Sequence, residues 1–147
     1  AEGSYIYSRD GKKYLDFVAG VSACSLGHRH PRVVKALKEQ LDKYLHVMVY
    51  GEYAQEPAVK LSKLLAEQLP APLEKTYLTN SGTEAIEGSI KLARRATGRT
   101  EIIAAKQAYH GNTMGSLSLM TYEERQKPFR PLIGDVSFID FNFDKCW

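Results

Sequence analysis

The chain has 147 residues, a formal net charge of +3 and two cysteines. With 44% hydrophobic residues it can bury a core, and its length by itself predicts one domain. Lys and Arg are interspersed with Asp and Glu, which argues against a nucleic-acid partner, and no apolar run approaches the length of a membrane span. Cys24 and Cys146 lie far apart without ligand-like neighbours, so we expect free thiols in a reducing compartment, by default the cytoplasm.

The N-terminal segment has the pattern of a β-hairpin. Two strand-like runs, at residues 5–7 and 14–17, flank Asp10-Gly11, a dipeptide typical of type I′ turns. Small residues are frequent from 18 to 26, which indicates a tightly packed loop.

His28 and His30 are two residues apart, a spacing that on a strand would place both on one face. No Cys or acidic partner stands close to them, so we expect a structural turn ahead of a helix and no metal site. Pro31 opens that helix, whose apolar stripe consists of Val34, Leu37, Leu41 and Leu45. A second helix is predicted from about residue 57 to residue 69.

The segment from Thr79 to Ala85 resembles an anion site at a helix N-terminus. It follows a strand-like run at 76–78 and precedes a helix predicted over 83–97. Ser81 and Glu84 form a capping box, in which the hydroxyl accepts from the amide of Glu84 and the carboxylate reaches the amide of Ser81. Gly82 allows the backbone to come close to a bound group. The first-turn amides, the Thr83 hydroxyl and the helix dipole favour a dianion there. A capped helix without any ligand is the alternative.

That helix is predicted to pack on a sheet through small residues at helical spacing and to end at Gly98. The predicted stripe consists of Ala85, Ser89, Leu92, Ala93 and Ala96.

The next strand, at residues 101–105, is of the continuous apolar kind found in parallel sheets, and a further strand is predicted over 135–141. The first of these strands leads to Tyr109 and His110. Because ligands of open α/β sheets bind beyond the carboxyl ends of strands, these side chains are candidates for a binding site. A packed surface aromatic is the alternative for Tyr109.

Taken together, these motifs resemble the class III (ornithine/acetylornithine/GABA-type) family of pyridoxal-5′-phosphate (PLP) aminotransferases. The match rests on their order and spacing over nearly the whole chain. It comprises the hairpin at 5–17, Gly27-His28-Arg29-His30-Pro31, Ser81-Gly82-Thr83, Lys91-Leu92-Ala93-Arg94, Thr97-Gly98-Arg99 and Tyr109-His110-Gly111.

The resemblance implies an incomplete fold-type I α/β structure, with an N-terminal segment at 1–56 and the first part of the PLP-binding large domain at 57–147. It places the cofactor phosphate on the Ser-Gly-Thr turn and the pyridine ring on the aromatic residue before His-Gly, and it brings Val21 to the substrate. It also implies a homodimer with residues 46–53 at its interface. The implied cofactor-binding residues are Ser81, Gly82, Thr83, Tyr109 and His110.

The implied activity is transfer of an amino group between an amino acid or ω-amine and a 2-oxo acid. In this family the Schiff-base lysine and the aspartate at the pyridine nitrogen lie beyond the position of Trp147, so no catalytic residue is assigned and the chain alone is expected to be inactive. Asn112 replaces the Arg, and Ile86 the Asn, usual in acetylornithine-type members, which weakens an assignment to arginine biosynthesis. Other reactions of the fold (aminomutase, decarboxylase, racemase) and a non-catalytic binding module remain alternatives.

Overall fold

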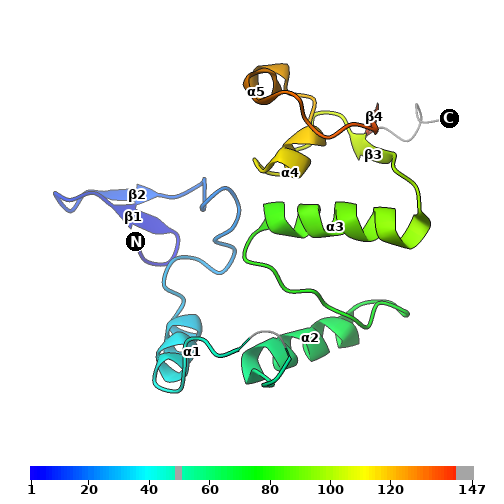
Figure 1. The fold of residues 1–147 in the computed structure, drawn as a ribbon. Coiled ribbons are helices and arrows are strands. Elements are labelled where there is room, and N and C mark those ends of the chain that lie inside the picture. The colour runs from blue at the N-terminus through cyan, green and yellow to red at the C-terminus, as the bar shows by residue number, and fades with distance from the viewer. Residues whose placement is uncertain (49–50, 142–147) are drawn as a thin grey trace. The chain divides into compact units, whose positions relative to one another are not determined.

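The computed structural model describes residues 1–48 and 51–141. The chain divides into two compact units, Ala1–Val59 and Lys60–Trp147, called here the N-terminal and the C-terminal unit (Figure 1). The domain boundary expected near residue 56 refers to a longer protein and stays a prediction.

The N-terminal unit begins with the predicted hairpin. Strands β1 (Tyr5–Tyr7) and β2 (Lys13–Leu15) pair antiparallel. The type I′ turn is wrong: the Gly11 amide donates to the Ser8 carbonyl at 3.0 Å, and Gly11 adopts the left-handed conformation with φ +84°. A type I′ turn centred on Asp10-Gly11 would require positive φ at both residues, and Asp10 does not adopt it. Gly11 instead occupies the last position of the turn that starts at Ser8. Its left-handed conformation costs little free energy because glycine has no Cβ.

The loop after β2 folds back on the residues before the first helix. The carboxylate of Asp16 lies 2.7 Å from Nε2 of His28, and the thiol of Cys24 lies 3.5 Å from Nδ1 of the same ring. The expectation that His28 has no acidic or Cys partner is therefore wrong, because chain reversal brings together residues up to 12 positions apart. Within the described residues, no cluster of three or more His, Cys, Asp or Glu has metal-binding geometry.

Two helices follow in chain order. Helix α1 (Pro31–Leu41) starts at the predicted proline, and α2 (Glu56–Gln68) begins one residue before the predicted start. The predicted stripe of α1 is largely exposed, with Val34 half-buried but Leu37 60% and Leu41 58% exposed. No residue of either helix is buried, so the described structure provides no core for them.

The C-terminal unit is built on one long helix and a pair of parallel strands. Helix α3 (Gly82–Thr97) is capped by Ser81 and ends at Gly98, which is left-handed as predicted. Strands β3 (Ile102–Ala105) and β4 (Val136–Ile139) pair in parallel, as the apolar sequence of the first predicts. Between them lie α4 (Met114–Ser118), α5 (Glu123–Gln126) and the short 3-10 helix η1 (Lys127–Phe129).

The core lies between α3 and these strands. Ile90 of α3 packs with Ala104 of β3 and with Leu119, and half-buried apolar residues surround them. Figure 1 shows β3 and α4 on the same side of α3. The small-residue stripe predicted for this helix is wrong: Leu92 is 67% exposed, and Ala85, Ser89, Ala93 and Ala96 are exposed as well. Ile86 and Ile90 lie one turn apart and offer more apolar area, so their face turns inward.

The strand predicted at residues 76–78 is also absent from the described structure. In the part of the chain described, β3 pairs with β4 alone, and a strand needs a neighbour for its backbone hydrogen bonds. Tyr77 is 82% exposed and lies against Gly88 of α3, where an added Cβ would be 3.3 Å from the tyrosine ring.

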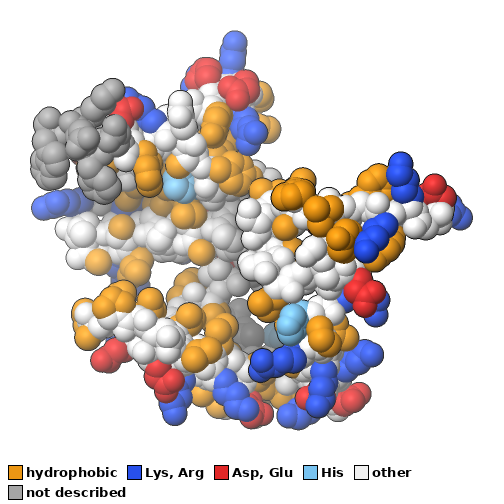
Figure 2. Space-filling view, turned by 180° about the vertical axis from the view of Figure 1, so that it is seen from behind, with side chains coloured by type: hydrophobic (Ala, Val, Ile, Leu, Met, Phe, Trp, Pro, Cys, Tyr) orange, Lys and Arg blue, Asp and Glu red, His pale blue; other side chains and the backbone are white. Residues whose placement is uncertain are grey.

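Many of the large apolar side chains are exposed to solvent. Figure 2 shows hydrophobic side chains scattered between charged ones over the face that it displays. Phe17 is 90% exposed, Val21 87% and Tyr77 82%, whereas five apolar residues are buried among those described, all between Ile90 and Met120. Among the helices described, none is both long and apolar enough to cross a membrane.

Candidate functional site

The N-terminus of α3 forms the first part of the candidate site. Ser81 Oγ accepts from the Glu84 amide at 3.3 Å, as the capping box predicts. The second hydrogen bond of the predicted capping box differs by one residue. Glu84 Oε2 accepts from the amide of Asn80 at 2.8 Å and not from the amide of Ser81. The first helical hydrogen bond joins the Ala85 amide to the Ser81 carbonyl at 3.1 Å.

This arrangement leaves the amides of Gly82 and Thr83 without an acceptor in the part of the chain described. The space beside Gly82 is open, because no atom lies within 4 Å of the position that a Cβ would take. Two uncapped amides, the positive end of a 16-residue helix and open space together suit an anion.

The side chain of Thr83 points to the second motif. Its Oγ1 lies 2.8 Å from Thr113 Oγ1 and 2.7 Å from Ser116 Oγ. Gly111 is buried at φ +126°, and a Cβ at that position would collide with the Thr83 side chain. The two motifs, about 30 residues apart in sequence, are therefore in direct contact, and a glycine is needed where they meet. The Thr83 hydroxyl, predicted to face a phosphate, has protein partners here.

Glu87 holds this junction together, and sequence reasoning missed it. Its Oε1 accepts from Thr113 Oγ1 at 2.5 Å, from the Gly115 amide at 2.8 Å and from the Ser116 amide at 3.1 Å. The Thr113 hydrogen bond, followed by the two amides, lowers the pKa of Glu87 against the opposing effect of burial. An acidic residue one turn after Thr83, beside the inward-facing Ile86, was the available signal.

Tyr109 and His110 follow β3, as predicted. Tyr109 is 62% exposed, with the guanidinium carbon of Arg125 at 5.8 Å from its ring centroid, and His110 is half-buried. Tyr109 also borders an open cavity of about 350 Å³, whose lining includes Asn112 and Leu117. The residues that line this cavity do not include Ser81, Gly82 or Thr83. The two parts of the candidate site are thus joined through the Thr83–Gly111 contact.

Val21 belongs to the N-terminal unit. It is 87% exposed and left-handed, with φ +56°, in a loop where Ala19 and Ser22 also have positive φ. The structure therefore brings the Ser-Gly-Thr turn to the His-Gly motif, but it does not relate Val21 to either.

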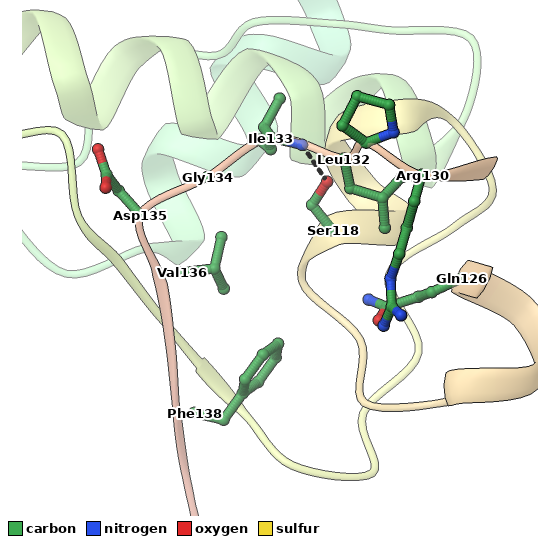
Figure 3. Close-up of a pocket in the computed structure, with 10 residues that line it drawn as sticks. Ser118, Gln126, Arg130, Leu132, Ile133, Gly134, Asp135, Val136 and Phe138 are labelled. Atoms are coloured by element: carbon green, nitrogen blue, oxygen red, sulfur yellow. Dashed lines mark hydrogen bonds between the residues drawn. The ribbon is translucent and has the colours of Figure 1, made fainter.

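A larger cavity, of about 560 Å³, lies beside the start of β4 (Figure 3). Its lining comprises residues 130–136, Phe138, Gln126 and Ser118. The Ser118 hydroxyl accepts from the Ile133 amide at 3.1 Å. This is the amino end of the strand, whereas the predicted ligand site lies beyond the carboxyl ends. Sequence reasoning had no signal for this cavity.

The model of the family "Aminotransferase class-III" matches residues 1–146. The acetylornithine aminotransferase of Archaeoglobus fulgidus is 43% identical over 141 residues, which cover 96% of this chain and 36% of that protein.

Two solved structures are similar as well. The adenosylmethionine-8-amino-7-oxononanoate aminotransferase of Methanocaldococcus jannaschii superposes with a TM-score of 0.89 at 32% identity, over 99% of this chain and 34% of that one. A PLP-bound amine transaminase from an uncultivated Pseudomonas species gives 0.83 at 26% identity, over 95% and 33% of the two chains.

The chain therefore belongs to the class III aminotransferase family. Its structure is a partial fold-type I aminotransferase of mixed α/β type. The chain spans about a third of the length of the relatives that it matches.

Proposed function

We propose that this chain is the N-terminal portion of a PLP-dependent transaminase that moves an amino group between an amino acid or ω-amine and a 2-oxo acid. The observation that carries the proposal is the contact between Thr83 and Gly111, which joins the helix N-terminus to the loop bearing Tyr109. Family membership supports the class of reaction. PLP acts in such enzymes as an electron sink for the amino-acid carbon that reacts.

The first part of the proposed cofactor site is a phosphate anchor at residues 81–83. The amides of Gly82 and Thr83 would donate to phosphate oxygens, and the dipole of α3 favours the dianion. The residues present fit such a group, because the space beside Gly82 is open and Ser81 already satisfies the amide of Glu84. Thr83 would contribute its amide, while its hydroxyl holds the neighbouring loop through Thr113 and Ser116.

The second part is an aromatic platform. Tyr109 is exposed enough to offer a ring face to the pyridine, and His110 lies next to it in the same loop. Glu87 would orient both parts, since it fixes the first turn of α4, and Thr113, the N-cap of that helix, contacts Thr83. These residues bind and orient the cofactor.

The remaining requirements lie outside residues 1–147 in this proposal. The lysine that binds the cofactor covalently and the aspartate at its ring nitrogen are assigned to the C-terminal part of the protein, so the chain alone does not transaminate. Val21 is proposed to meet the substrate in the whole protein. Homodimer formation is supported by apolar exposure in the N-terminal unit, such as Phe17 and Leu45, and a cytoplasmic location by the free thiol of Cys24.

The phosphate anchor is tested with pyridoxamine 5′-phosphate, which carries the phosphate but cannot react with lysines as an aldehyde does. The chain should bind it about tenfold more tightly than pyridoxamine, a preference of roughly 1.4 kcal/mol. Gly82→Val should abolish the preference by filling the open space, whereas Gly134→Val, at another open position, should retain it. Equal binding of the two compounds by the unaltered chain would contradict the anchor.

A further inference from the structure

The side chains of Asp16, His28 and Cys24 in the N-terminal unit form a chain of polar contacts. None of the three belongs to the proposed cofactor site. Asp16 Oδ2 lies 2.7 Å from His28 Nε2, and His28 Nδ1 lies 3.5 Å from Cys24 Sγ. The His28 and Asp16 side chains are 23% and 11% exposed, and Cys24 is half-buried. A thiol beside a base that is itself oriented by a carboxylate is the arrangement that activates cysteines for attack, and here these groups are Cys24, His28 and Asp16.

The carboxylate determines which nitrogen of the ring faces the thiol. The hydrogen bond from His28, followed by the amide of Ala19, lowers the pKa of Asp16, so this group is ionised at neutral pH and can only accept. Nε2 of His28 must then carry the hydrogen. In the neutral ring, Nδ1 is left with its lone pair directed at the Cys24 thiol, ready to take the thiol proton.

Backbone hydrogen bonds hold all three residues in place. The amide of His28 donates to the Gly3 carbonyl at 2.7 Å, and the amide of Gly3 donates back to the His28 carbonyl at 2.9 Å. The Asp16 amide donates to the Ser4 carbonyl at 2.9 Å, and the Cys24 amide to the Ala19 carbonyl at 2.8 Å. A constellation held in this way is organised before any reagent arrives.

We propose that Cys24 is a base-assisted thiol at which this chain takes up a small disulfide. The Sγ proton passes to His28 Nδ1, and Sγ attacks one sulfur of the disulfide. A new S–S bond forms to Cys24 while the old one breaks, and the other half leaves as a thiolate that takes up a proton. Cys24 is oxidised to a mixed disulfide and the departing half is reduced, so no other oxidant is needed.

The test measures the reaction of the 147-residue chain with bis(2-hydroxyethyl) disulfide, a small neutral probe. Samples are quenched with acid, and intact mass and peptide mapping give separate rates for Cys24 and Cys146. The same reaction in guanidinium chloride supplies the rate of each thiol in the unfolded chain. In the folded chain, Cys24 should react at least about tenfold faster than it does when unfolded.

Two variants separate activation by the base from simple accessibility. His28→Gln removes the base, and Asp16→Asn retains Oδ1 for the loop amides but presents an amide to the ring, which favours the other tautomer. Both should lower the Cys24 rate to the unfolded value or below it. If access to the thiol limited the rate, a variant with a looser loop would instead react faster at Cys24. Circular dichroism checks that each variant is folded.

A folded wild-type chain whose Cys24 reacts no faster than in the unfolded state would overturn the proposal. So would an unchanged rate in a folded His28→Gln chain. If His28→Gln does not fold, Asp16→Asn decides by the same criterion. None of these outcomes depends on PLP, so the proposal stands or fails separately from the cofactor site.

Discussion

The two units of this chain are stabilised in different ways. In the C-terminal unit, Ile90, Ala104 and Leu119 form a buried core, and the candidate cofactor site is built on its edge. Among the described residues of the N-terminal unit none is buried, and the structure there depends on backbone hydrogen bonds and the Asp16–His28 pair. The site motifs and the core share elements of the C-terminal unit, so damage to the junction at Gly111 should also destabilise this unit.

Gly111→Ala should have the largest effect. The new Cβ would collide with Thr83, and the residue would retain a φ that disfavours side chains, so we expect a loss of about 4 kcal/mol in unfolding free energy. Gly134→Ala is the matched control, because its Cβ would meet nothing within 4 Å. Denaturant unfolding followed by circular dichroism measures both. Equal stabilities would show that the junction at Gly111 is looser than described.

Two positions on α3 distinguish the core from the exposed face. Ile90→Ala should cost about 3 kcal/mol, because Ile90 is 6% exposed and its truncation leaves a cavity. Leu92→Ala, on the face predicted from sequence to pack, should change stability by less than about 1 kcal/mol, because Leu92 is 67% exposed. The same unfolding measurement applies. A larger loss of stability in Leu92→Ala than in Ile90→Ala would mean that the small-residue stripe is the packing face of α3.

Glu87→Ala should cost about 2 kcal/mol, since it removes the acceptor shared by Thr113 and the amides of Gly115 and Ser116. Glu67→Ala, which removes an exposed carboxylate 4.0 Å from Lys63, should change stability by less than about 0.5 kcal/mol. Thermal unfolding of the two variants measures the difference. Similar melting temperatures would mean that Glu87 does not organise the junction.

Acidification should have the smallest effect. The pKa of Glu87 is lower in the folded chain than its ordinary value of 4.5, so its contribution is complete above that pH and is lost as pH falls through the folded pKa. Stability measured from pH 7 down to pH 3 should fall more in the wild type than in Glu87→Gln. Parallel curves for the two proteins would contradict the lowered pKa.

Local sequence signals predicted the helices and the parallel strands well. The Ser81 cap, the Gly98 terminator and Pro31 each act within one turn, and the apolar run at 101–105 already indicated a parallel strand. The two caps and the proline depend on residues that are close in the chain, so they act with little help from tertiary packing, whereas the parallel strand also needs β4 as its neighbour.

Predictions that depend on a distant partner were less successful. The segment at 76–78 has a strand-like sequence but no neighbouring strand, and the partners of His28 come from residues brought near by chain reversal. The role of Glu87 depends likewise on Thr113, Gly115 and Ser116, which lie 26 to 29 positions away. Residues 49–50, which belong to the predicted dimer interface at 46–53, lie outside the described residues, as do residues 142–147 at the end of the predicted large-domain segment.

The most direct test of the cofactor site is an amide NMR titration of the chain with pyridoxamine 5′-phosphate. We predict that the Gly82 and Thr83 amide signals shift most and that residues near Tyr109 shift as well, whereas pyridoxamine should leave the Gly82 and Thr83 signals unchanged. Amides of β1 and β2 in the N-terminal unit serve as the reference. Unmoved Gly82 and Thr83 signals at saturating ligand, or the same shifts with pyridoxamine, would contradict a phosphate anchor at the start of α3.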